Sequence, residues 1–75
     1  MDLRDVFATN LRRCRSAKGI SQDALAYDAG VSRSYLSQIE KGKYYASLKI
    51  IGRIADTLGV EPAELLRLPK ARRAK

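Results

Sequence analysis

Five of the polar side chains in the short stretch between Gly30 and Lys43 need water or a polar partner. They are Arg33, Ser34, Ser37, Gln38 and Lys41. An arginine can donate two hydrogen bonds to guanine, a glutamine can pair with adenine through two bonds, and serines reach either bases or phosphates. The stretch therefore either binds an anionic partner or needs another explanation for its run of donors. Glu40 stands among them, and a carboxylate in an anion-binding surface needs its own explanation.

The positive charge of the chain is concentrated around this stretch. The 75 residues carry fifteen Lys and Arg against eight Asp and Glu, which gives a net charge of +7. Four of the basic residues fall in the last seven positions, and residues 29–55 hold five basic residues against a single acid, Glu40. Such clustering favours a directed electrostatic patch over a generally basic surface.

The composition also narrows the classes of function. There is no histidine, which removes the commonest general base and the commonest nitrogen ligand for metals. The single cysteine cannot form an intrachain disulfide, so we expect a cytoplasmic protein. No apolar run approaches the roughly 20 residues of a membrane span. The start, MDLRDVF, does not resemble a secretory signal. The scattered carboxylates lack a companion base or nucleophile, so we expect no enzyme. We also expect no cofactor, no metal and no membrane partner.

Apolar residues spaced three and four apart predict a first helix at the start of the chain. This stripe consists of Leu3, Val6, Phe7, Leu11 and Cys14. Gly19 then ends the helix as a left-handed cap. Because Cys14 lies on the stripe, we expect a buried, inert thiol and not a redox sensor.

Serines that suit helix starts divide the middle of the chain into three more helices. Ser21, Ser32 and Ser47 each precede a helical pattern and are good N-caps. They predict helices at about residues 22–28, 32–41 and 48–58. The last of these should bury one apolar face, formed by Leu48, Ile51, Ile54, Ala55 and Leu58.

A fifth, short helix is expected before the chain becomes strongly basic. Pro62 suits its first turn, and the helix should end near Arg67 with Leu65 and Leu66 pointing inward. The sequence therefore predicts an all-α fold, a compact bundle of five short helices in one domain over residues 1–68. Residues 69–75 are expected to be a basic disordered tail.

The stretch SQDALAYDAGVSRSYLSQIEKGK resembles the helix-turn-helix of the lambdoid Cro/cI repressor family, also called the XRE family. The matched positions are Ser21, Gln22, Leu25, Ala26, Gly30, Val31, Ser32, Leu36, Ser37, Ile39, Glu40 and Gly42. The similarity covers about residues 5–68 and implies a lambda-repressor-like DNA-binding domain. Three features depart from the family pattern. Tyr45 and Ala46 replace the frequent Asn-Pro, Cys14 replaces a leucine, and Glu61 replaces a capping Ser or Thr.

The resemblance implies a sequence-specific regulator of transcription, expected to be a repressor, that reads double-stranded DNA with helix 32–41 in the major groove. On the helical wheel, Leu36 and Ile39 mark the buried side. The residues expected to contact bases are Arg33, Ser34, Ser37 and Gln38. The residues expected to contact the DNA backbone are Gln22, Tyr35, Lys41, Lys43, Tyr44 and Lys49. For each of them, an ordinary surface role is the alternative, and for Tyr35 the alternative is packing on the fourth helix.

Glu40 falls close to the buried side of the wheel, away from the donors. In the family pattern its partner is Arg15 of the first helix. We therefore expect a largely buried Arg15–Glu40 ion pair that fixes the third helix against the first.

One module of this size reads only a few base pairs, so we expect a homodimer on a palindromic operator. The leucine-rich fifth helix and the apolar residues near it are our prediction for the dimer surface. An alternative is a protein-interaction module, such as an antitoxin or a subunit of a larger regulator, whose helix-turn-helix mainly binds protein.

Overall fold

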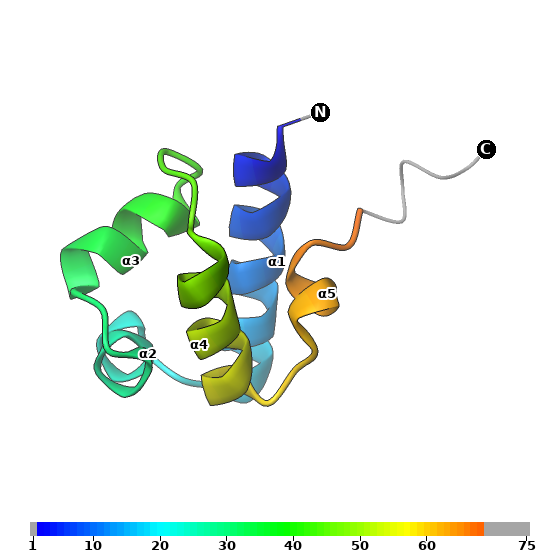
Figure 1. Ribbon diagram of the computed structural model, residues 1–75. Helices are drawn as coiled ribbons and strands as arrows, with labels where there is room; N and C mark the ends of the chain where they lie inside the picture. Colours follow the sequence, from blue (N-terminus) through cyan, green and yellow to red (C-terminus); the bar gives the residue numbers. More distant parts are fainter. Residues whose placement is uncertain (1, 69–75) are drawn as a thin grey trace.

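The computed structural model describes residues 2–68, which form five α-helices (Figure 1). The helices are α1 (Leu3–Lys18), α2 (Gln22–Ala29), α3 (Arg33–Glu40), α4 (Leu48–Leu58) and α5 (Pro62–Leu65). The described residues contain no strand, so the predicted all-α class and the order of the helices are confirmed. No helix in this part of the chain is long and apolar enough to cross a membrane. The predicted basic tail lies outside the described residues.

The predicted serine caps set three of the helix starts. The hydroxyl oxygens of Ser21, Ser32 and Ser47 each accept a hydrogen bond from a backbone N–H three residues later, over 3.0, 3.0 and 3.2 Å. Asp2 caps α1 in a similar way, but it accepts from the N–H of Arg4, two residues later. Each cap satisfies an amide that the helix itself leaves unpaired.

The fifth helix is shorter than predicted, because it ends at Leu65 and not near Arg67. Glu61 makes no side-chain cap at its start. Its end is set by α1, where the buried amide of Asn10 donates to the carbonyl oxygens of Leu65 and Arg67, over 3.0 and 2.8 Å. The sequence pattern gave no indication of this contact.

The helices surround one apolar core. Figure 1 shows α2 and α3 on one side of α1 and α5 on the other, and α4 packs against α1, α2 and α5. The largest fully buried side chains are Leu11, Leu25, Leu36, Ile39, Ile54, Leu58 and Leu65. Cys14 is buried among them, as predicted.

Two predicted core residues lie at the surface. Leu48 is 84% exposed and Leu3 is 50% exposed, so their assignment to buried faces was wrong. Both are the first residue of their helix. Side chains in a helix lean towards its N-terminus, so a side chain at the first position projects past the core.

The contrast between Leu48 and Ile54 yields a stability prediction. We expect Ile54→Val to lower the free energy of unfolding by about 0.5–1.5 kcal/mol, because it removes one buried methyl group. Leu48→Ala removes more atoms, yet we expect a change within about 0.5 kcal/mol because they are in water already. Urea unfolding followed by circular dichroism measures both. A larger loss for Leu48→Ala would contradict the described packing of α4.

Candidate nucleic-acid interface

The third helix has one buried side and one polar side. Leu36 and Ile39 are fully buried. Of the residues expected to contact bases, Arg33 and Ser34 are exposed, whereas Ser37 and Gln38 are half-buried. A short helix with this division can insert its polar side into a groove while its apolar side stays in the core.

The turn between α2 and α3 holds the two helices in a tight corner. Gly30 has a φ of +74°, a left-handed conformation that glycine adopts without strain. The N–H of Val31 then bonds to the carbonyl of Ala26 over 3.0 Å. Ala26 is buried, and its small side chain lets the helices approach closely.

The expected Arg15–Glu40 ion pair is present, and it ties the end of α3 to α1. Arg15 Nε and Nη2 donate to the two carboxylate oxygens of Glu40, over 2.7 and 3.1 Å. Glu40 is only 3% exposed. Arg12 adds a second link from α1, because its Nη1 donates to the backbone carbonyl of Glu40. Arg15 also donates to the carbonyl of Ile20, over 2.9 Å. Ile20 lies in the connection between α1 and α2, so the same guanidinium holds this connection as well.

Gln22 belongs to the same polar cluster, which sequence reasoning missed. Its Nε2 donates to Glu40 Oε1 over 2.9 Å. Its Oε1 accepts a hydrogen bond from Arg33 Nε over 3.4 Å. The first position of α2 is thereby joined to both ends of α3. One Nε2 hydrogen of Gln22 is used by Glu40, and the amide has a second to offer.

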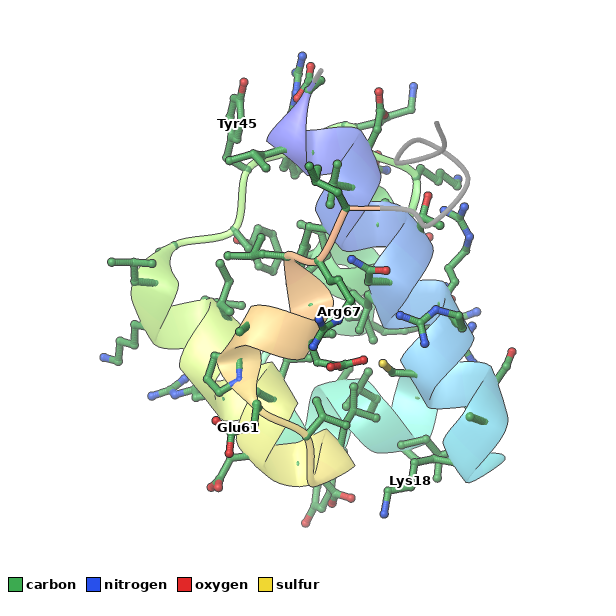
Figure 2. The ribbon with its side chains drawn as sticks, turned by 90° about the vertical axis from the view of Figure 1, so that its right-hand side faces the viewer. Lys18, Tyr45, Glu61 and Arg67 are labelled. Carbon is green, nitrogen blue, oxygen red and sulfur yellow. The ribbon has the colours of Figure 1, made fainter. Side chains whose placement is uncertain are left out.

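The loop after α3 is held against the first turn of α1. Gly42 has a φ of +75°, and a Cβ atom there would lie 2.8 Å from Asp5 Oδ1. The guanidinium of Arg4 lies over the ring of Tyr45, 4.8 Å from its centre. Figure 2 shows Tyr45 beside this end of α1, and Lys18 at the other end.

Arg4 is itself fixed by Asp2, the capping residue of α1. Their closest contact is 2.7 Å, between Arg4 Nη2 and Asp2 Oδ2. This hydrogen bonding lowers the pKa of the Asp2 carboxyl group to about 2. The carboxylate therefore keeps its charge, and with it the contact that positions Arg4 over Tyr45.

The residues expected to contact the DNA backbone fall on three helices and one loop, with Gln22 on α2. Tyr35, half-buried on α3, stacks on Tyr44 of the loop with ring centres 6.2 Å apart. The three lysines, Lys41, Lys43 and Lys49, are exposed. Lys41 and Lys43 directly follow α3, and the N–H of Lys43 bonds to the carbonyl of Gln38 over 3.1 Å. Lys41, Lys43 and Tyr44 thus lie directly after α3, and Lys49 lies in the first turn of α4.

Comparison with known proteins identifies this arrangement. Residues 6–68 match the sequence profile of a helix-turn-helix domain. The chain belongs to the helix-turn-helix family. Within this family the chain is of the XRE, or Cro/cI-like, type, as the sequence motif predicts.

Two relatives of this helix-turn-helix protein are regulators by name. This chain is 41% identical over 71 residues to a hypothetical transcription factor of Neisseria meningitidis serogroup B, and the match covers 95% of this chain and 67% of the relative. It is 38% identical over 66 residues to control protein C.BamHI of Bacillus amyloliquefaciens, covering 87% and 82%. A crystal structure of the restriction-modification controller protein C.AhdI from Aeromonas hydrophila has a TM-score of 0.80 at 42% identity, covering 83% of this chain and 94% of that one.

Removing one partner of the buried Glu40 cluster should destabilise the domain strongly, because the other partner is left uncompensated. We expect Glu40→Gln to lower the free energy of unfolding by about 3–5 kcal/mol, because it leaves the Arg15 guanidinium without its buried counter-charge. The matched control is Glu64→Gln, which breaks the exposed Glu64–Arg67 pair. We expect that change to cost at most about 1 kcal/mol. Chemical unfolding of both variants makes the comparison, and equal costs would contradict a structural role for Glu40.

Proposed function

We propose that this protein binds double-stranded DNA in a sequence-specific manner and represses transcription. The observation that carries the proposal is the outward polar side of α3, on a helix fixed at its start by Ser32 and at its end by Glu40. A rigid helix places its donors at constant positions, and such constancy is what recognition of base edges requires.

In this proposal α3 lies in the major groove and α2 crosses the DNA backbone. Base contacts come from Arg33, Ser34, Ser37 and Gln38. The second amide hydrogen of Gln22 and the free N–H groups at the start of α2 are available for a phosphate. The other backbone contacts come from Tyr35, Lys41, Lys43, Tyr44 and Lys49. The positions of Tyr35 on α3 and of Lys41, Lys43 and Tyr44 directly after it support this role, because phosphates flank the groove that α3 enters.

A homodimer on a palindromic operator is part of the proposal, since one α3 spans too few base pairs for a selective site. The contribution expected from α5 is reduced, because Leu65 is fully buried in the domain's own core. Tyr45 and Leu48 are exposed and are available for apolar contact.

Repression is the part of the proposal that follows from occupation of the operator. The described residues consist of a DNA-binding unit, so the direct physical effect of binding is to cover the operator against other proteins. The similarity to proteins named as transcriptional regulators and control proteins supports a regulatory role.

A salt titration separates DNA binding from the alternative of a protein-interaction module. We expect affinity for random duplex DNA to fall steeply between 50 and 200 mM salt, by a factor of about 10³ if six phosphates are contacted. Selection from a random DNA library then yields the preferred site and the half-site spacing. Weak binding that does not depend on salt would count against DNA as the partner.

Base and phosphate contacts should respond differently to substitution. We expect Arg33→Ala or Gln38→Ala to weaken binding to the selected site by about 1–3 kcal/mol and to relax the preference at one position. Lys43→Ala should weaken selected and random DNA alike, with a shallower salt dependence. Fluorescence anisotropy on both DNAs measures this. Equal losses on the two DNAs for Arg33→Ala would assign Arg33 to a phosphate.

A further inference from the structure

The side chain of Arg33 is held from one edge by two residues of α2. Its Nε lies 3.4 Å from Asp23 Oδ1 and 3.4 Å from Gln22 Oε1. Both contacts use Nε, which leaves the terminal Nη1 and Nη2 groups on the other edge of the guanidinium. A planar guanidinium reads guanine with two parallel N–H groups, so these are the atoms that a bidentate contact needs.

The orientation of Gln22 follows from the buried ion pair. A carboxylate can only accept hydrogen bonds, so the NH₂ group of Gln22 must face Glu40. The carbonyl oxygen Oε1 of the same amide is then directed to Arg33. Arg15, Glu40 and Gln22 thus form a chain of contacts that ends at Arg33 Nε.

Asp23 is the unexpected member of this group. It is an acid in the first turn of α2, 76% exposed, beside two residues assigned to DNA. A carboxylate near phosphates opposes binding to any DNA sequence. Its cost is offset if it improves recognition of one sequence over others.

We propose that Asp23 is a positioning residue, which fixes Arg33 so that its two Nη groups face a guanine. Arg33 is a long side chain, 61% exposed, and it would otherwise sample many rotamers. Contact with Asp23 and Gln22 restricts that freedom before DNA arrives. This inference rests on the proposed function, and it concerns specificity and not overall affinity.

The test is Asp23→Asn, with Asp28→Asn as the matched control. Asp28 is an exposed acid of the same helix, so its substitution makes the same change in net charge. Binding is measured on three duplexes: the selected site, the same site with the guanine opposite Arg33 replaced by adenine, and random DNA. Thermal unfolding of both variants checks that these exposed substitutions leave the fold intact.

We expect Asp23→Asn to reduce the preference for guanine over adenine about threefold to fivefold, in line with the modest strength of an exposed ion pair. Affinity for random DNA should equal or exceed that of the wild type, because a negative charge is lost. Asp28→Asn should leave the preference for guanine unchanged. In an Arg33→Ala background, Asp23→Asn should have no further effect on the preference.

Three results would overturn the inference. One is an equal effect of Asp23→Asn and Asp28→Asn on the preference, which would show that only net charge matters. Another is a stronger preference for guanine in Asp23→Asn, which would show that Asp23 withdraws Arg33 from DNA. The third is an unchanged preference in Arg33→Ala itself. Failure of the wild type to bind any of the duplexes would instead remove the proposed function, and this inference with it.

Discussion

A buried carboxylate, that of Glu40, fixes the position of α3 in this domain. Glu40 receives hydrogen bonds from Arg15 of α1 and Gln22 of α2, and its own backbone carbonyl receives one from Arg12. A charge so deep in a small core requires such partners, because it has lost its water. Satisfying it therefore fixes three helices relative to one another.

The same requirement sets the functional geometry. The acceptor-only character of Glu40 orients the Gln22 amide, and the amide oxygen contacts Arg33 at the other end of α3. The loop after α3 is held in place by two contacts. The guanidinium of Arg4 lies over the ring of Tyr45, and Tyr44 stacks on Tyr35. Polar and aromatic contacts thus add to the apolar packing of Leu36 and Ile39 in fixing α3 and the loop after it.

Much of the fold could be predicted, because caps and apolar stripes are local features. Ser21, Ser32 and Ser47 each mark the start of a helix by a cap that spans only four residues of sequence. The exposure of Leu48 could not be predicted in this way. Periodicity assigns a residue to one face of a helix, but it does not show whether another element packs on that residue. The link between Gln22 and Glu40 joins residues 18 positions apart, and no spacing rule contains it. The ion pair of Glu40 was accessible only because the family pattern supplied Arg15 as its partner.

The end of α5 is encoded outside α5. One amide group, on Asn10 of α1, holds two carbonyl oxygens that lie 55 and 57 residues further along the chain. Aspartate has the same shape, but it would bring an oxygen where a nitrogen now donates. Hydropathy and helix propensity barely distinguish the two residues. A single-atom exchange at position 10 would thus remove the attachment of this segment while leaving every conventional sequence pattern of the domain intact.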